Sequence, residues 1–129
     1  MGVYSVDKDE WSPCAKLNIS RYSHASCILG DMLYVSSGLS EDSIEVANCM
    51  DLISGSSDSW KILNVRYCAD HHVFSPISST EILIMHKKDV SIFDTKSNTI
   101  KKAGTSQHML ECKYNQFAMN RDGQVVALV

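Results

Sequence analysis

The sequence predicts an all-β protein built from repeated, antiparallel, four-stranded units. Aromatic markers recur about every 50 residues, and short apolar runs alternate with turn residues between them. Trp11 recurs as Trp60, and Tyr22 recurs as Tyr67 and then as Tyr114. No segment longer than about ten residues combines a 3.6-residue apolar period with helix caps, so almost no helix is expected.

Each repeat opens with two strands joined by a turn. In the first complete copy, apolar runs at 25–29 and 32–35 flank Gly30-Asp31, and in the last copy Asp122-Gly123 precedes the run at 125–129. Such glycine-containing pairs between apolar runs indicate hairpins. The middle copy has its runs at 72–74 and 82–85, with a turn over 75–80 between them.

Each repeat then closes with a second pair of strands. The pairs are predicted at 43–47 and 59–63 in the first complete copy, at 90–93 and 99–100 in the next, and at 3–6 and Trp11 at the start. Four short strands per repeat are typical of a β-propeller blade. A lone twisted sheet cannot bury both of its faces, so such blades must stack on their neighbours.

The repeats divide the whole chain, 1–129, into four parts of an incomplete propeller. These are the tail of one blade (1–18), two blades (19–64 and 65–104) and the first hairpin of the next blade (105–129). Propellers have about four to eight blades. We therefore expect a fragment of a longer protein, or a chain that finds its missing blades elsewhere.

The repeat resembles the kelch family. The matching stretches are Arg21-Tyr22-Ser23-His24, then 33–38 ending in Ser37-Gly38, then Ile44-Glu45-Val46 and Trp60, and residues 89–98 resemble the turn between the third and fourth kelch strands. The second copy departs from the family pattern, with His86-Lys87 at the double glycine and Ile100 at the tryptophan. The resemblance implies a kelch-type propeller, and kelch proteins generally act as protein-binding platforms.

Composition and charge narrow the function classes. A formal net charge of −3 and a pI near 5.9 argue against a nucleic-acid partner, which needs a clustered basic surface. No apolar run approaches the roughly 18 residues of a membrane span, and the first ten residues lack the apolar core of a secretory signal. The five cysteines are scattered without C-x-x-C spacing, which favours reduced thiols in a cytoplasmic protein.

Five charged residues are candidates for partner binding. Arg21, Arg66 and Lys113 each precede the first strand of a unit, and Glu41 and Asp42 occupy a predicted turn. A ring of basic side chains would bind an acidic peptide through charge-assisted hydrogen bonds. Alternatively, each basic residue braces a neighbouring blade by bonding loop carbonyls, and the two acids are simply solvated.

The aromatic residues have two interpretations as well. They form either a binding strip or, as we expect, the packing between blades, because aromatic rings supply much of the buried area in such stacks. The residues concerned are Tyr22, Tyr34, Trp60, Tyr67 and Tyr114.

No catalytic, cofactor-binding or metal-binding residue is expected. His71 and His72 are adjacent, so on a strand they point to opposite faces and cannot share an ion. No regular ligand spacing surrounds them, and nothing near Cys68 indicates an activated thiol.

The leading functional hypothesis is a protein-interaction or scaffold module. It would recognise substrates for a ubiquitin ligase, or act as a cytoskeletal or signalling scaffold. Loops at 39–42, 65–70, 86–88 and 105–112 would line one face and set specificity. The alternative is a fragment of an enzymatic kelch-like propeller of the copper oxidase or sugar isomerase type.

Overall fold

The predicted all-β class is confirmed by a computed structural model of the chain. The structure describes residues 2–38, 42–55, 58–67, 69, 72–110, 116–119 and 125–128. Its strands are β1 (Gly2–Ser5), β2 (Glu10–Pro13), β3 (Ala25–Leu29), β4 (Met32–Ser36), β5 (Ser43–Asn48), β6 (Trp60–Arg66), β7 (Val73–Pro76), β8 (Glu81–Asp94), β9 (Thr99–Leu110), β10 (Gln116–Met119) and β11 (Val125–Leu128). A single helix within the described residues, α1 (Cys49–Ser54), lies between β5 and β6.

Every strand pairs antiparallel with its neighbour along the chain inside small, separate sheets. The order is β1-β2, then β3-β4-β5-β6, then β7-β8-β9, then β10-β11. The β3–β6 sheet therefore has the four strands predicted for one complete unit. Within the described residues no sheet closes on itself, and no helix is long and apolar enough to cross a membrane.

The third sheet contains a strand that folds back on itself. A 14-residue extended strand would span about 45 Å. However, Thr80 and Thr95 lie just outside the two ends of β8, and the backbone N–H of Thr95 donates to the carbonyl of Thr80 at 2.8 Å. The two ends of the strand are therefore close together. Lys87, in the middle of β8, has a φ of 54°. The sequence predicts two separate strands here, and the structure joins them into one bent strand. One arm pairs with β7 and the other with β9, so this sheet also has four strand-like rows.

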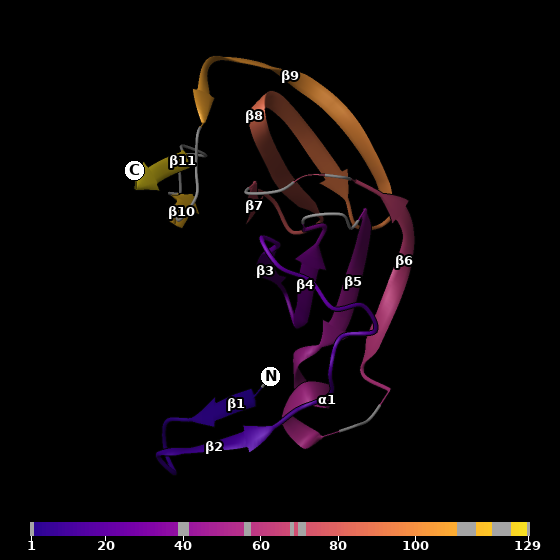
Figure 1. Ribbon diagram of the computed structural model, residues 1–129, viewed down its shortest axis with the longest axis vertical. Coiled ribbons are helices and arrows are strands. Elements are labelled where there is room, and N and C mark those ends of the chain that lie inside the picture. The colour runs from indigo at the N-terminus through magenta and orange to yellow at the C-terminus, as the bar shows by residue number, and fades with distance from the viewer. Residues whose placement is uncertain are drawn as a thin grey trace.

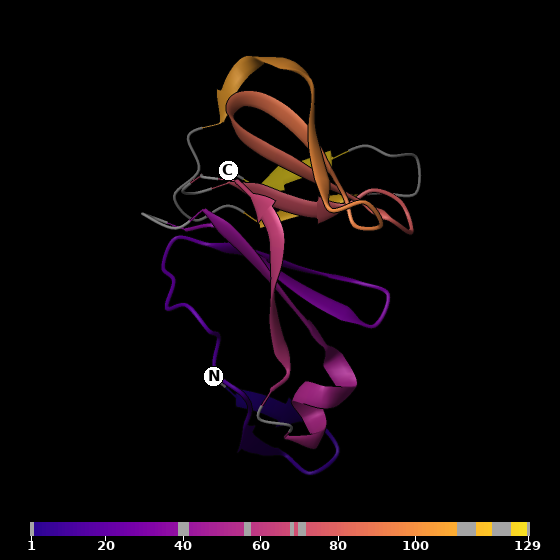
Figure 2. The ribbon, with the colours of Figure 1, turned by 90° about the vertical axis from the view of Figure 1, so that its right-hand side faces the viewer.

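The sheets follow one another along an arc (Figure 1). The first strands of successive sheets pack together: β3 contacts β7, and β7 contacts β10. The last strands, β6 and β9, lie on the opposite, convex side of the arc. Figure 2, turned by 90°, shows the β7–β9 sheet stacked on the β3–β6 sheet.

The main core lies between these two stacked sheets. Tyr34, Ile44 and Val46 come from the β3–β6 sheet, and Phe74, Ile82, Ile84 and Phe93 come from the β7–β9 sheet. The rings of Tyr34 and Phe93 meet edge to face, with centroids 6.1 Å apart. Cys27 packs against this cluster, and burial raises the pKa of its thiol to about 12, so it stays protonated. Sheet-on-sheet packing is thus what buries the apolar faces.

A smaller core covers the other face of the β3–β6 sheet. Val35, Ala47 and Trp60 from the sheet pack there with Leu52 of α1. The indole N–H of Trp60 donates to the carbonyl of Ala15 at 3.0 Å, which ties the segment after β2 to this sheet. The packing between sheets expected for the aromatic residues is seen for Tyr34, whereas Trp60 packs within its own sheet and against α1. It is not seen for Tyr22, which is exposed.

The short helix α1 has local causes that a periodicity search misses. The side chain of Asn48 caps its start by accepting a hydrogen bond from Met50 N at 2.8 Å. Gly55 ends it with a φ of 81°. Six residues are too few for a 3.6-residue pattern to stand out.

Two strands cross the predicted limits between repeats. β6 extends to Arg66 and β9 extends to Leu110, beyond the expected limits at 64 and 104. The division of the chain into blades stays a prediction.

We expect Phe93→Ala to destabilise the protein by about 3–5 kcal/mol, because it leaves a cavity where two sheets meet. The matched control is Ile28→Ala on β3, whose side chain is exposed and whose truncation should cost well under about 1 kcal/mol. Urea unfolding followed by circular dichroism measures both. Equal losses for the two variants would mean that this contact does not hold the sheets together.

Candidate functional site

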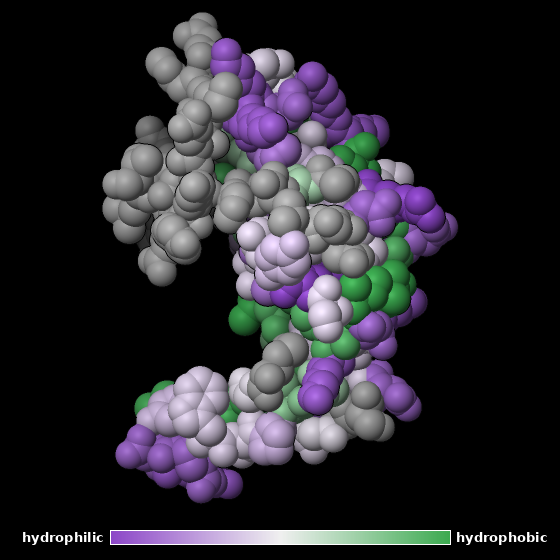
Figure 3. All heavy atoms as spheres, viewed as in Figure 1, coloured by the Kyte–Doolittle hydropathy of each residue, from purple (hydrophilic) through white to green (hydrophobic). Residues whose placement is uncertain are grey.

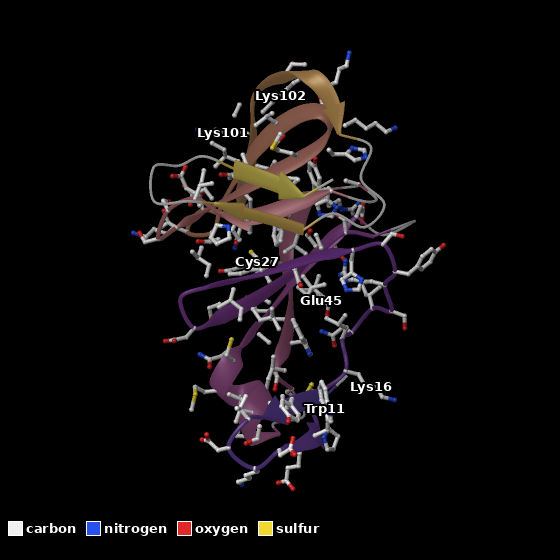
Figure 4. All side chains as sticks on the ribbon, turned by 90° about the vertical axis from the view of Figure 1, so that its left-hand side faces the viewer. Trp11, Lys16, Cys27, Glu45, Lys101 and Lys102 are labelled. Carbon is white, nitrogen blue, oxygen red and sulfur yellow. The ribbon has the colours of Figure 1, made fainter. Side chains whose placement is uncertain are left out.

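A fully buried ion pair lies at one end of the β3–β6 sheet. Arg21 precedes β3, and its Nη2 and Nε atoms lie 3.0 and 3.2 Å from Oε2 of Glu45 on β5. Both side chains are 0% exposed. Figure 4 shows Glu45 near the middle of the molecule, on the β3–β6 sheet. The other carboxylate oxygen, Oε1, accepts the backbone N–H of Asn18 at 2.9 Å.

The same guanidinium also holds the loop between β4 and β5. Its Nη1 donates to the carbonyls of Ser37 at 3.0 Å and Ser43 at 2.6 Å, and its Nη2 donates to the Ser43 hydroxyl at 2.7 Å. A buried charge is tolerated only when it is paired and its remaining donors are satisfied, as here. A side chain without solvent exposure cannot reach a partner, so the geometry of Arg21 favours its bracing interpretation over partner binding.

The braced loop is tied in turn to the segment between β6 and β7. The backbone N–H of Tyr67 donates to Asp42 O at 2.7 Å, and that of Gly38 donates to Ala69 O at 3.3 Å. The Ser37 hydroxyl donates to the Tyr67 carbonyl. We call this joined surface the loop face; it comprises Ser37, Gly38, Asp42, Arg66, Tyr67 and Ala69.

Gly38 allows the backbone to pass close to the segment before β3. Its φ is 121°, and an added Cβ would lie 2.7 Å from the carbonyl oxygen of Tyr22. Only glycine combines this conformation with such a close approach. Glycine is therefore required at position 38 by backbone geometry.

Two of the predicted partner-binding residues meet on the loop face. Arg66 Nη1 lies 3.8 Å from Asp42 Oδ2, with side chains 87% and 50% exposed. They border a shallow depression of about 340 Å³, together with Ile62 and Asn64 of β6. A register shift between β5 and β6 occurs at this point, after Ser43. Glu41 and Lys113 lie outside the described residues.

Histidine 72 connects the loop face to the next sheet. Its Nε2 is hydrogen-bonded to the buried hydroxyl of Ser36 on β4, and its ring packs beside Tyr67 and Phe74 at centroid distances of 6.0 and 6.1 Å. Sequence reasoning considered this histidine only as a metal ligand and missed its packing role. In the described part of the chain no group of three or more histidine, cysteine or acidic residues is placed to hold a metal ion.

A second histidine lies close to the buried ion pair. Burial, and secondarily the positive charge of Arg21, lowers the pKa of His24. His24 therefore stays neutral at pH 7, and Arg21 supplies the positive charge beside Glu45.

The next sheet presents an equivalent corner on the same side. Its bend at Lys87 in β8 pairs with Leu110 at the end of β9, just as the β4–β5 loop lies beside the end of β6. Figure 2 shows both corners on one side of the stacked sheets. Of the loops expected along one face, residues 39–41 lie outside the described residues, so their placing stays a prediction.

Comparison with known proteins identifies no relative of this chain. No family model matches the chain, and no curated protein matches it significantly. The interpretation of the loop face therefore depends on its own contacts and charges.

Removing Arg21 should destabilise the fold by about 3–5 kcal/mol, because Glu45 is left charged and buried without its partner. We expect Arg21→Met to show this loss in urea unfolding, and the double variant Arg21→Met/Glu45→Leu to regain part of it. A double variant no more stable than the single one would show that the uncompensated charge is not the cause.

We expect Gly38→Ala to cost about 1–3 kcal/mol, because the methyl group meets a backbone carbonyl and the conformation is strained for other residues. Gly30→Ala is the matched control: its φ is also positive, at 61°, but nothing lies within 4 Å of an added Cβ. The difference between the two variants in thermal unfolding measures the close approach together with the added strain of a φ of 121° over one of 61°. No difference would contradict it.

Proposed function

We propose that the chain is an arc of a kelch-type β-propeller and that it acts as a protein-interaction module through the loop face. The observation that carries the proposal is the loop face itself. Its backbone is fixed from below by a buried ion pair, while Arg66 and Asp42 remain accessible above. A fixed backbone with free charged side chains is suited to recognition because little order is lost on binding.

The arrangement of the sheets supports the propeller part of the proposal. Two successive units each have four strand-like rows, and β3, β7 and β10 lie in succession along the concave side (Figure 1). Blades placed radially would bring their first strands together in this way. The kelch resemblance of residues 21–60 points to the same architecture.

The exposed positive charge of Arg66 indicates the chemistry of the partner. Its pairing with Asp42 is long and exposed, and such pairs contribute only about 0–1 kcal/mol. A carboxylate of the partner can therefore replace Asp42 beside the guanidinium with little loss of free energy. It can then accept two parallel hydrogen bonds from Arg66. The apolar side chain of Ile62, half-exposed beside the depression, adds a contact for a neighbouring apolar group. We infer an acidic peptide segment as the ligand.

Two cellular roles fit a module of this kind. Either the loop face recognises substrates for a ubiquitin ligase, or it holds a cytoskeletal or signalling assembly together. Both roles follow from the kelch resemblance, and both use the same binding surface.

The test uses peptides of known sequence. Binders are selected from a random peptide library on the immobilised protein, and each is resynthesised with its acidic residues replaced by their amides. We expect Arg66→Glu to weaken the acidic peptides by about tenfold or more, since hydrogen bonds to charged groups contribute about 1.5–3 kcal/mol. Isothermal titration calorimetry gives the affinities.

A lysine at the other end of the same strand supplies the control. Lys61 on β6 is exposed and pairs with Val46, five positions along the strand from Arg66. Lys61→Glu makes the same charge change and should leave the affinities unaltered. Equal binding of acidic and amide peptides, or equal effects of the two substitutions, would contradict the proposal.

A further inference from the structure

The register shift between β5 and β6 shapes the depression beside the loop face. Ser43 pairs with Arg66 and Glu45 pairs with Ile62, so β6 advances four positions while β5 advances two. The backbone of β6 is therefore bowed at residues 63–65, in the manner of a β-bulge with two extra residues. The whole bowed segment lines the depression, which has a volume of about 340 Å³.

The bow brings two exposed side chains closer together than their sequence spacing suggests. Alternate residues of a strand point to one face, and directly paired residues share that face. The Arg21 guanidinium contacts both the Ser43 hydroxyl and the Glu45 carboxylate, so these two side chains do point to the same face. Their partners Arg66 and Ile62 therefore stand on that face about 7 Å apart along the strand, instead of the roughly 13 Å of a straight four-residue stretch.

An amide side chain lies between these two residues on the bow. Leu63 and Val65 pack against the main core, which fixes the segment. Asn64 between them is exposed and lines the depression, and within the described residues its carboxamide makes no hydrogen bond. The depression thus presents an apolar side chain, an amide and a guanidinium in sequence order, from Ile62 to Arg66.

This order of groups matches a short peptide in an extended conformation. Every second side chain of an extended chain lies on one side, at a spacing of about 7 Å. The N–H and C=O of a single residue point to the same edge of such a chain, and those of its neighbours point to the other edge. A carboxamide both donates and accepts, so Asn64 can bind the two backbone groups of one residue at once.

We propose that the depression binds an extended segment whose apolar and acidic residues are two positions apart. The apolar side chain packs on Ile62, the carboxylate binds Arg66, and Asn64 donates to the C=O and accepts the N–H of the residue between them. This inference rests on the proposed acidic-peptide function and adds the conformation and spacing of the ligand.

A helical ligand fits the side-chain spacing but not the amide. Helix residues four positions apart also lie about 6 Å from each other. Their backbone groups, however, are used in the hydrogen bonds of the helix itself, so Asn64 would find no partner there.

The position of β6 limits the ligand to a short segment. Within the described residues β6 pairs with β5 alone, and it borders the convex side of the arc. Figure 3 shows hydrophobic and hydrophilic side chains adjoining each other along that side. A bulge bends an edge strand and hinders the addition of a further strand along its whole length. The depression is also near the lower end of the range of about 300–1,000 Å³ for ligand sites.

The first test varies the spacing of the two recognised residues. Peptides with blocked ends carry one leucine and one glutamate in a serine and glycine background, separated by zero, one, two or three residues, in both orders. We expect one order with a single intervening residue to bind about threefold to tenfold more tightly than every other spacing, because only it makes all the contacts at once. Isothermal titration calorimetry gives the affinities. Tightest binding with three intervening residues would indicate a helix and overturn the proposal.

The second test removes one backbone hydrogen bond from the best peptide. An ester oxygen replaces the N–H of the middle residue, which should weaken binding to the unsubstituted protein by about threefold or more. With Asn64→Leu the same ester should have no effect, because the acceptor is already gone. The control ester replaces the N–H of the preceding residue, which points to the opposite edge, and should leave both affinities unchanged.

The outcomes separate this inference from the proposed function. An ester effect of equal size in both proteins, or in neither, would overturn the role of Asn64, and the ester on the unsubstituted protein gives this result without any folded variant. Equal binding at every spacing, with affinity still dependent on the glutamate and on Arg66, would overturn the extended ligand and leave the acidic-peptide function standing. Equal binding of glutamate and glutamine peptides would contradict that function itself, and this inference with it.

Discussion

The packing of one twisted sheet against the next is the constraint on which this structure depends. One face of each of the two stacked sheets packs against the other sheet. Side chains such as Ile44 and Phe93 are buried from water by this packing. A single unit would expose these residues to water, so its stability comes from the stack. This also explains why the inner strands β3, β7 and β10 contact in series, while β6 and β9 lie along the convex side.

The buried pair of Arg21 and Glu45 fixes a surface loop to the β3–β6 sheet. One guanidinium reaches a carboxylate on β5 and two loop carbonyls, so the strand end and the loop cannot move independently. Gly38 then brings the loop against the next connection. The backbone beneath the accessible charges of the loop face is thus held by two fully buried side chains.

Sequence patterns predicted the strands well and the side-chain roles poorly, for physical reasons. The runs at 25–29 and 32–35 alternate beside a tight turn, and they became β3 and β4. Helix α1 is set by two capping residues, which carry no periodicity. Whether an arginine is buried depends on a partner 24 positions away, and sequence spacing alone does not identify that partner. Arg66 and Asp42 meet for the same non-local reason.

Helix α1 lies at the end of its sheet that is farther from the loop face, so a change in the length of this connection does not alter the loop face. It connects the end of β5 to the start of β6, whereas the loop face lies at the start of β5 and the end of β6. The equivalent connection in the next sheet is a four-residue turn between β8 and β9. We therefore expect this rim to tolerate insertions, and a reporter domain grafted beyond Gly55 to leave the loop face at the other end of the strands undisturbed.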